Sequence, residues 1–531
     1  MNRHLTFRIL LASIFFTVIS CSKDSDNPDS SEITVTTSNF SATIDENPTN
    51  GQSIGTVSGS TSQGSVTFSI TEQNPAGAFS IDSASGELKV ADESLFDFET
   101  NPTITGTVRV TNGGVSKNAL VTITLNDLVE ENIYQGTIQL KTQQEVIDFG
   151  ANNYTRITGD LIIGDLNLNG QSTVTDLTPL NTITTLDLNL VVIRNIYLRF
   201  VDGLENLTSI GGDIRFSYND VLENIEALTY PGRINHTLWI SKNPKLINLK
   251  GLENVTSVKG DIKISDNDSM INLDGLENLT IADSNIDIEY NEALQNINAL
   301  SNLTSITANY YCCGSLNINY NDSLNNIDGL SNLIHIGYSL KIIGNPLLAN
   351  IDGLQSLSGT AEFSVEIGGN GITNVDGLQN FTGFNKYLYL SGNTSLLNLD
   401  GLSNVTFVME GFNINNNPSL KDIDGLNNLQ DVGISLSLKN NQSLLNINGL
   451  VNLREIEYSL TIIDNPLLEN LDSLSNLTSV EDLRIWENTT LSDFCGLRPL
   501  LLLNGVSGEY RIYDNAYNPT KQNIIDGNCS L

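Results

Sequence analysis

The 531-residue chain is poor in basic residues. It has 26 Lys and Arg residues against 61 Asp and Glu residues, which gives a formal net charge of −35. A surface of this charge repels polyphosphates and anionic lipid headgroups, so the composition argues against a nucleic-acid-binding protein and against docking on a membrane by charge. The balance suits a soluble exported protein and is compatible with cation binding.

Histidine is scarcer still, and of the three histidines only His236 and His335 lie beyond the first 20 positions. Neither lies in a nucleophile motif or a zinc motif. Carboxylates are abundant, but they recur with the sequence repeat described below, so no carboxylate pair of the kind that glycosidases use can be singled out. We therefore expect that the protein is not an enzyme.

Long apolar runs are confined to the N-terminus. Residues 1–20 have the features of a targeting segment, because Arg3 and Arg8 precede the apolar run Ile9–Ile19, which is too short for a stable membrane anchor. The run leads into Val18-Ile19-Ser20-Cys21, which resembles a bacterial lipobox. No later stretch of about 18 apolar residues predicts a transmembrane helix.

The lipobox resemblance implies cleavage before Cys21 and lipidation of that cysteine. Residues 21–31 are polar and are expected to form a flexible tether. Lys23-Asp24 resembles the acidic signals that send some Bacteroidetes lipoproteins to the exterior face of the outer membrane. The alternative is an ordinary secretory signal followed by a cysteine of no special role.

The other four cysteines form two groups. Cys495 and Cys529 bracket the last segment, and in an oxidising exported setting we expect them to form a disulfide. Cys312 and Cys313 are adjacent, and three interpretations stay open: a vicinal disulfide, a metal or redox role, and two buried free thiols. Four ligands at zinc spacing are absent, which argues against a metal site.

A 24-residue repeat occupies most of the chain. Asp-Gly-Leu or a close variant recurs every 24 residues from position 202 to 472, except for one interval of 30 that contains the insertion Asn309–Gly314. In the unit at 441–464 the apolar residues lie at seven fixed places. These are Leu444, Ile447, Leu450, Leu453, Ile456, Leu460 and Ile462. The first five step by three and the last two by two, which predicts tight turns followed by a short strand with one face buried.

Each repeat is therefore expected to be one coil of a solenoid, since a single coil cannot bury its own apolar face but stacked coils form one core. Two imperfect coils before the regular array bring the expected number to roughly 14. Thr142–Phe149 is expected to form a short capping helix over the first coil, with Thr142 as N-cap and Glu145 three residues on.

Asparagine also recurs with the repeat, in three columns, one of which includes Asn219, Asn243 and Asn267. Asparagine tolerates left-handed turn geometry, and its amide can bond backbone groups or the next amide in a stack. We interpret the columns as structural, in preference to reading the recurring Asn-Leu-Thr as glycosylation sites. The Asp-Gly pairs are likewise interpreted as turn residues and not as catalytic carboxylates.

The repeat, of the form GLxNLxxIxxxLxIxxNxxLxx(I/L), resembles the receptor L domain family, a relative of leucine-rich repeats, from Gly159 to about Asn488. The family includes the ligand-binding lobes of insulin- and growth-factor-type receptors and many bacterial surface proteins. The resemblance implies a right-handed parallel β solenoid used for binding. It carries over no binding residues, because the motif does not fix them.

The segment before the repeats has alternating stretches separated by turn residues, which predicts an antiparallel β-sandwich of about 100 residues. The stretches are Val66–Ile70, Gly86–Val90, Thr105–Val110 and Ala119–Leu125. The segment also has landmarks that resemble a cadherin repeat. They are Asp45–Pro48, Phe79–Asp82, Ser85–Leu88, Leu95–Glu99 and Val121–Asp127.

The cadherin resemblance implies calcium as the cofactor, with Glu46, Asp97, Glu99 and Asp127 as ligands at one pole of the sandwich. Calcium takes six to eight oxygen ligands, several of them carboxylate, so these residue types fit. The sequence departs from the family pattern at three places, which puts calcium in doubt against a rigid spacer with acidic turns. They are Ser58-Gly59-Ser60, Asn112-Gly113-Gly114 and Thr124, where aspartates or an Asp-x-Gly are usual.

The predicted organisation is all-β in five parts. They are a signal peptide at 1–20, a tether at 21–31, a cadherin-like sandwich at 32–130, the solenoid at 131–490 and a C-terminal cap at 491–531 closed by the disulfide.

A binding face is expected on the solenoid sheet, where inward residues are constant and outward residues vary. The candidate residues are Arg215, Tyr218, Trp239, Lys263, Asp287, Tyr290, Tyr320 and Tyr389. Clustered aromatic and arginine side chains on an exposed face are typical of interfaces and glycan platforms. An ordinary solvated face is the alternative for these residues.

The leading hypothesis is a lipid-anchored adhesion or binding protein of the cell surface, whose solenoid recognises a protein or glycan and whose cadherin-like domain is a spacer. The alternative is a structural spacer of the cell envelope without a specific ligand, and an enzyme with a diffuse site is the third.

Overall fold

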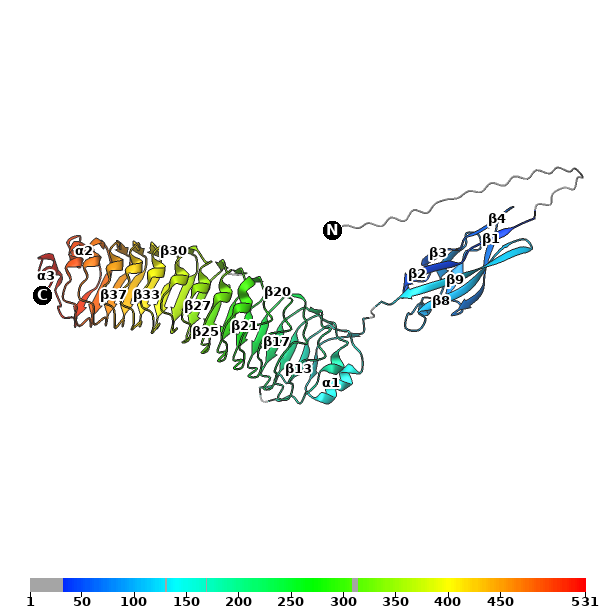
Figure 1. Cartoon of the computed structure of the whole chain (residues 1–531), viewed down its shortest axis with the longest axis horizontal. Coiled ribbons are helices and arrows are strands. Elements are labelled where there is room, and N and C mark those ends of the chain that lie inside the picture. The colour runs from blue at the N-terminus through cyan, green and yellow to red at the C-terminus, as the bar shows by residue number, and fades with distance from the viewer. Residues whose placement is uncertain (1–31, 129–130, 169, 308–313) are drawn as a thin grey trace, which may run out of the picture. The chain divides into compact units, whose positions relative to one another are not determined.

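The chain divides into two compact units, Met1–Glu130 and Glu131–Leu531. Both consist of β-strands with few helices, which confirms the predicted fold class (Figure 1). The computed structural model describes residues 32–128, 131–168, 170–307 and 314–531. The targeting segment with Cys21, and the adjacent pair Cys312 and Cys313, lie outside these residues.

The first unit is a β-sandwich. Its larger sheet has the order β2-β9-β8-β5, its smaller sheet has the order β3-β7-β6, and β1 pairs with β4. The bounds are β1 Val35–Thr37, β2 Phe40–Asp45, β3 Ser53–Thr56, β4 Gly59–Thr61, β5 Thr67–Asn74, β6 Phe79–Ile81, β7 Glu87–Val90, the 3-10 helix η1 Glu93–Leu95, β8 Thr103–Asn112 and β9 Val115–Asn126. The pairs are antiparallel except β2 with β9, which run parallel.

Alternation of apolar and polar residues accounts for the strands of this unit. In β9, Ala119, Val121, Ile123 and Leu125 are buried, while the residues between them face outward. Successive side chains of a strand point to opposite faces, so one face of β9 packs into the core between the sheets. Each of the four predicted stretches lies within or beside a strand, and the strands β5, β8 and β9 extend beyond the predicted bounds.

The second unit is a solenoid built on one parallel sheet of 16 strands. The strands are β11 Ile138–Leu140, β13 Leu161–Gly164, β15 Leu190–Ile193, β17 Ile214–Ser217, β19 Leu238–Ser241, β21 Ile262–Ser265, β23 Ile286–Glu289, β25 Leu316–Asn319, β27 Ser339–Ile343, β29 Ser364–Gly368, β31 Leu388–Ser391, β33 Gly411–Asn415, β35 Ser435–Lys439, β37 Ser459–Ile463, β38 Asp482–Trp486 and β39 Tyr510–Tyr513. We call it the main sheet. It has two strands more than the coils expected, because β11 and β39 extend the pairing at the two ends.

A second row of short parallel strands forms another side of the solenoid. The strands are β10 Ile133–Tyr134, β12 Arg156–Ile157, β14 Thr185–Leu186, β16 Ser209–Ile210, β18 Gly232–Ile234, β20 Val255–Val258, β22 Ile281–Ala282, β24 Ser305–Ile306, β26 His335–Ile336, β28 Gly359–Ala361, β30 Phe381–Phe384, β32 Phe407–Val408, β34 Asp431–Val432 and β36 Glu455–Ile456. They form three separate sheets, of four, five and five strands.

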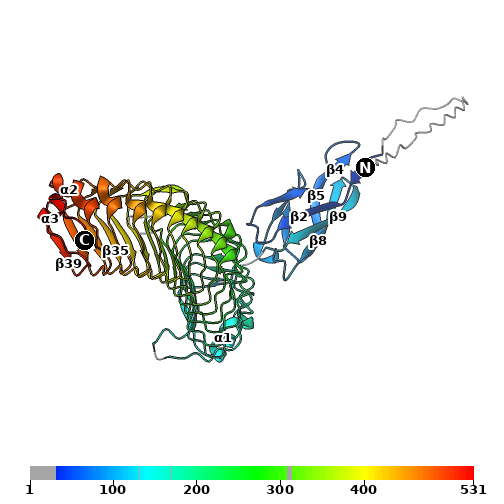
Figure 2. The ribbon, with the colours of Figure 1, turned by 60° about the vertical axis from the view of Figure 1, so that its left-hand side comes forward.

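Short 3-10 helices run along a third side of the later coils, where Figure 2 shows them as a continuous row. They are η3 Asn298–Asn302, η4 Asp328–Leu330, η5 Asp352–Leu354, η6 Asp376–Leu378, η7 Asp400–Leu402, η8 Asp424–Leu426, η9 Asn448–Leu450, η10 Asp472–Asn476 and η11 Cys495–Leu497, with η2 Thr178–Leu180 at the other end. The Asp-Gly-Leu signature of the sequence therefore forms a single helical turn in these coils.

The glycine of this signature is required by close packing between coils. A Cβ on Gly401 would lie 2.1 Å from the carbonyl oxygen of Val375 in the preceding coil. In earlier coils the same signature adopts another turn, in which Gly251 and Gly275 have φ of +108° and +113°. There a following glutamate accepts a hydrogen bond from the glycine N–H, as Glu253 does from Gly251 at 2.8 Å.

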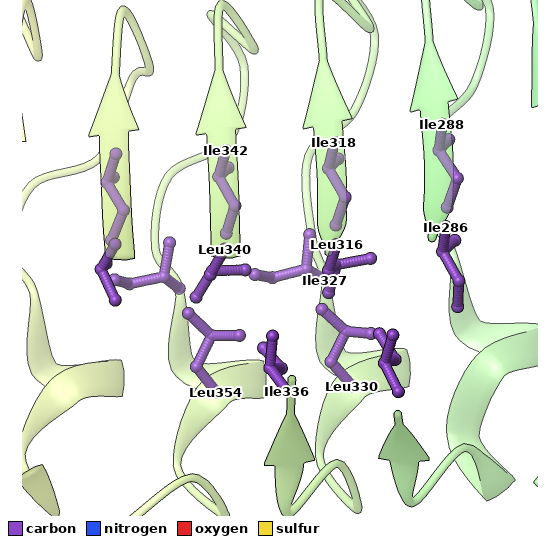
Figure 3. Close-up of a cluster of buried hydrophobic side chains, with 14 of the residues drawn as sticks. Ile286, Ile288, Leu316, Ile318, Ile327, Leu330, Ile336, Leu340, Ile342 and Leu354 are labelled. Atoms are coloured by element: carbon purple, nitrogen blue, oxygen red, sulfur yellow. The ribbon is translucent and has the colours of Figure 1, made fainter. Parts of the chain in front are cut away.

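The core of the solenoid is a continuous column of aliphatic side chains. Figure 3 shows Leu316 and Ile318 of β25 and Leu340 and Ile342 of β27 pointing inward beside Leu330 of η4. All seven apolar places of the unit at 441–464 are buried. Each buried aliphatic side chain contributes about 1.5–3 kcal/mol relative to an exposed one, so the repeat builds its stability by stacking.

A ladder of buried asparagines joins the coils at the end of the main-sheet strands. The backbone N–H and the Nδ2 of Asn219 donate to Oδ1 of Asn243, at 3.3 and 2.9 Å, and Nδ2 also donates to the carbonyl of Val192. The bond from the backbone N–H to the next Oδ1 repeats from coil to coil as far as Asn515. One amide therefore satisfies buried polar groups of two neighbouring coils, which would otherwise cost about 1–3 kcal/mol each.

The two ends of the solenoid are covered by helices. The helix α1, Gln143–Gly150, has the predicted capping box between Thr142 and Glu145 and buries Val146 and Phe149. The other end carries α2 Arg498–Leu502 and α3 Lys521–Ile525, and the predicted disulfide joins Cys495 to Cys529. Among the described residues, no helix is both long and apolar enough to cross a bilayer.

The ladder predicts a large effect of a single buried amide. Asn345→Ala removes the acceptor of the Asn321 N–H and the donor to the Ile318 carbonyl, so we expect a loss of about 2–4 kcal/mol in unfolding free energy. The control Asn350→Ala removes one hydrogen bond, to the Asp352 N–H outside the ladder, and should cost about 1 kcal/mol or less. Urea unfolding of the full chain measures both, and equal effects would contradict the role of the ladder.

Candidate functional site

The outward side chains of the main sheet form rows that run from coil to coil. The central row contains the residues between the two inward ones of each strand. Its members are Arg215, Trp239, Lys263, Asp287, Asn317, Lys341, Glu366, Tyr389, Asn413, Ser437, Thr461 and Arg484. The in-register parallel pairing places each of these residues beside its equivalent in the next coil.

The edge row contains the residue that precedes each ladder asparagine. Tyr218, Tyr290 and Tyr320 belong to it, with φ of 58°, 56° and 55°. Their side chains are exposed to 37%, 49% and 46%. The left-handed conformation costs a bulky residue about 1 kcal/mol or more. The buried asparagine that follows each tyrosine holds the backbone in this conformation. The edge-row tyrosines therefore lie one residue beyond the strands, whereas Trp486 lies within β38 and stacks on Tyr513.

Six side chains of the two rows form what we call the cation–aromatic cluster. Its members are Arg194, Arg215, Tyr218, Trp239, Lys242 and Lys263. The guanidinium of Arg194 and the ammonium of Lys242 lie 4.8 and 5.0 Å from the ring centre of Tyr218. Those of Arg215 and Lys263 lie 4.2 and 5.8 Å from the ring of Trp239. Each aromatic ring thus has a cation from the coil before it and a cation from the coil after it.

Local hydrogen bonds orient the cluster. Nε of Arg215 donates to the Ser217 hydroxyl at 2.9 Å, and the indole N–H of Trp239 donates to the Ser241 hydroxyl at 2.8 Å. Burial lowers the pKa of the Arg215 guanidinium, and the positive charge of Arg194 lowers it further. The lowered pKa therefore reflects mainly the loss of solvent around Arg215, with the charge of Arg194 as a smaller cause.

A second aromatic group lies further along the same face. The rings of Tyr290 and Tyr320 stack with centroids 4.9 Å apart and an interplanar angle of 13°. Beside them, Asp287 accepts a hydrogen bond from Nδ2 of Asn317 at 2.7 Å, and burial raises the pKa of the Asp287 carboxyl. Tyr389 lies apart from both groups and stacks on Tyr387.

Further along the central row, the basic residues form ion pairs with neighbouring carboxylates. Lys341 pairs with Glu366 at 3.5 Å, and Arg484 pairs with Asp482 and Glu509. The structure thus brings Arg215, Tyr218, Trp239 and Lys263 together, but separates them from Tyr389.

Sequence analysis did not single out Arg194 and Lys242. The signal that could have found them is their position directly before Asn195 and Asn243, the same position that Tyr218 occupies before Asn219.

Another side of the solenoid has a hollow of opposite charge. It has a volume of about 530 Å³, and its lining includes Asp431, Glu455, Glu457 and Glu481 together with Met409. Four carboxylates in one hollow disfavour an anionic ligand there. The outward face of the main sheet and the side that bears the hollow therefore differ in charge.

At one pole of the β-sandwich, carboxylate oxygens of Glu46, Glu99 and Asp127 lie within 4.8 Å of one another. Glu46 is buried, and its two carboxylate oxygens accept hydrogen bonds from the N–H groups of Phe98 and Leu128, at 2.7 and 2.6 Å. It thus fixes both the loop that bears Glu99 and the segment that bears Asp127.

The fourth predicted ligand, Asp97, points elsewhere. Its carboxylate accepts hydrogen bonds from the N–H and the hydroxyl of Thr100, both at 3.0 Å, which lower the pKa of Asp97. Glu99 behaves in the opposite way. A hydrogen bond with its own backbone lowers its pKa, but desolvation and the negative charges of Glu46, Asp127 and Asp97 prevail and raise it.

Residues 40–126 match the family model of the cadherin domain. The first unit is therefore called the cadherin-like unit below. No curated protein matches the chain.

Solved structures similar to this chain include three cadherin ectodomains. The human desmocollin-1 ectodomain is 21% identical with a TM-score of 0.16, over 19% of this chain and 22% of that chain. Drosophila N-cadherin EC1–4 is 25% identical with a TM-score of 0.16, over 19% and 28%. Human protocadherin-24 EC1–2 is 16% identical with a TM-score of 0.15, over 19% and 50%. The chain thus spans half or less of the length of each.

The raised pKa of Glu99 predicts a pH-dependent effect on stability. An acid whose pKa is raised on folding stabilises the fold below its unfolded pKa and loses that contribution as pH rises through the folded pKa. In EDTA at about pH 7, Glu99→Gln should therefore raise the Tm of the cadherin-like unit by removing repulsion. The gain should vanish near pH 4, below the ordinary pKa of 4.5.

Calorimetry of the full chain measures this transition. Glu72→Gln, at an exposed position on β5, is the matched control and should leave the Tm unchanged at both pH values. A gain from Glu99→Gln that persists unchanged at pH 4, or no gain at pH 7, would contradict the like-charge interpretation.

Proposed function

We propose that the chain is a cell-surface binding lipoprotein whose solenoid recognises a protein or glycan through the outward face of the main sheet. One observation carries the proposal: the inward residues of the coils repeat, whereas the outward rows change from coil to coil and gather aromatic and cationic side chains between β17 and β25. Aromatic and arginine side chains dominate the energetics of interfaces.

Two resemblances support a binding role. The repeat resembles receptor L domains and leucine-rich repeats, which present parallel sheets to ligands, and cadherin domains in general mediate adhesion. In this proposal the cadherin-like unit is a spacer between the solenoid and a lipid on Cys21, in a bacterial outer membrane and facing the exterior. The sequence Val18–Cys21 supports the lipid anchor. The proposal assigns no enzymatic reaction, because the outward rows hold no nucleophile paired with a base.

A triple variant tests the binding face. Arg215→Ala, Trp239→Ala and Tyr290→Ala together remove one cation and two rings, and we expect binding to fall by at least about 30-fold, or about 2 kcal/mol. Binding is measured on a glycan array and by pull-down from the native community. The matched control replaces Asn413, Ser437 and Thr461 of the same row with alanine and should bind normally.

Unchanged binding by the triple variant would exclude the main-sheet face as the site. A wild-type chain that captures nothing on the array or in the pull-down would favour the alternative function, a structural spacer of the cell envelope. Circular dichroism of both variants shows whether the fold is retained.

We further propose that the carboxylate pole of the cadherin-like unit binds calcium through Glu46, Glu99 and Asp127. Three converging carboxylates and a raised Glu99 pKa fit a divalent cation, since its charge would relieve their repulsion. Glu46 also accepts two backbone N–H bonds, so it offers only its remaining lone pairs. Bound calcium would hold the loop at Glu99 and the segment at Asp127 in place.

Calcium binding predicts a shift in stability. Calcium at about 100 times its dissociation constant stabilises the folded unit by about 2.7 kcal/mol, so millimolar calcium should raise the Tm of its transition in the full chain. Asp127→Asn should abolish the shift, and Glu72→Gln should retain it. If calcium leaves the Tm unchanged, or if Asp127→Asn still responds, the pole does not bind calcium.

A further inference from the structure

The four cations of the cation–aromatic cluster lie on four consecutive coils, one on each. Arg194 follows β15, Arg215 lies in β17, Lys242 follows β19 and Lys263 lies in β21. They alternate between the edge row and the central row. Paired strands are about 4.8 Å apart, so the cluster is a linear array of positive charge that advances by about 4.8 Å per coil along the solenoid axis.

This array stands out against the composition of the chain. Nine Lys and Arg residues, four of which form the array, occur between positions 194 and 263, and none occurs between 264 and 340, in a protein with a net charge of −35. Arg194 and Arg215 repel one another, and a negatively charged ligand on the array would relieve that repulsion.

Within the described part of the chain, three of the four cations form no ion pair. Lys263 pairs with Asp261 at 3.0 Å, but Arg194, Arg215 and Lys242 form no ion pair with any residue in the described ranges. Nε of Arg215 is held by Ser217, and its two Nη groups make no hydrogen bond to the described chain. They are free to donate a pair of hydrogen bonds to a carboxylate or sulfate.

The aromatic rings of the cluster hold the cations in place and do not offer a stacking platform. Tyr218 and Trp239 each have cations from both neighbouring coils between 4.2 and 5.8 Å from the ring centre, and these cations compete with a nucleic-acid base for the ring. The cation–π contacts keep four long side chains at fixed spacing, which lowers the entropy cost of binding a ligand with regularly spaced charges.

We infer that the cation–aromatic cluster binds a linear anionic polysaccharide, laid along the solenoid axis with its carboxylate or sulfate groups on successive cations. The inference rests on the proposed binding function and names its ligand class. In an extended polysaccharide, charged groups on successive sugar units are separated by about the length of one pyranose ring. This separation is similar to the spacing of about 4.8 Å between successive coils. An extended acidic peptide presents its same-face side chains every 6.6–6.8 Å or so, which fits the array less well.

Direct binding with a fluorescent reporter tests the inference. The chain has two tryptophans, so Trp486→Phe leaves Trp239 of the cluster as the only one. The probes are polygalacturonate and dextran sulfate, which separate carboxylate from sulfate, with neutral dextran, polyglutamate and oligo-dT as comparisons. We expect an anionic polysaccharide to change the Trp239 emission and neutral dextran to have no effect.

The charge dependence gives a second readout. Raising the ionic strength from about 0.1 M to about 1 M shortens the Debye length from about 10 Å to about 3 Å and should abolish binding. Arg215→Gln with Lys242→Gln should weaken binding roughly tenfold, because two of four charge contacts are lost. Arg194→Gln with Lys242→Gln is a second variant, in case the first disturbs Trp239. The matched control, Lys341→Gln with Lys386→Gln, removes two ion-paired lysines elsewhere and should bind normally.

Three results would overturn the inference: no binding of either anionic polysaccharide, tighter binding of polyglutamate or oligo-dT, or equal binding by the cluster variants and wild type. If the polyanions fail but a neutral glycan or a protein binds in a way that the Arg215, Trp239 and Tyr290 triple variant abolishes, this inference fails and the proposed function stands. If the triple variant also changes nothing, both fail.

Discussion

The solenoid depends on the hydrogen bonds of its buried asparagine ladder. At the end of each main-sheet strand the chain turns inward, and the turn leaves an N–H and a carbonyl inside the protein without a strand partner. The amide of the ladder asparagine satisfies groups of two coils, as Asn345 does for the Asn321 N–H and the Ile318 carbonyl of the preceding coil and the Ile343 carbonyl of its own. Buried polar groups that are left unpaired are costly, so the ladder makes tight turns and a continuous apolar core compatible.

The same ladder determines where outward side chains can gather. Because the asparagine is buried, the residue before it must adopt a left-handed conformation, which directs its side chain to the outer edge of the sheet. Tyr218, Tyr290 and Tyr320 occupy this position although glycine would be less strained. Packing in the core therefore restricts the inward residues of the repeat, whereas the residues of the edge and central rows can vary. Variation in these rows is the basis of the proposed binding face.

Acidic and basic side chains gather on different surfaces of the protein. Carboxylates dominate the composition, converge at one pole of the cadherin-like unit and line the hollow near Glu455. Four cations gather on one part of the main sheet, where Arg194 and Lys242 lie within 5.0 Å of the ring centre of Tyr218. Cationic ligands are therefore expected at the carboxylate sites, and anionic ligands at the cation–aromatic cluster.

The sequence by itself determined the all-β class, the 24-residue coil, the inward apolar places, the capping box at Thr142 and the Cys495–Cys529 disulfide. These features are local or strictly periodic, so spacing and residue type are sufficient to predict them. The tertiary structure alone decided the parallel pairing of β2 with β9 and the extension of the main sheet to β11 and β39. It also decided the arrangement of Arg194, Tyr218 and Lys242. Their contacts join residues 24 positions apart, and only the stacking register brings such residues together.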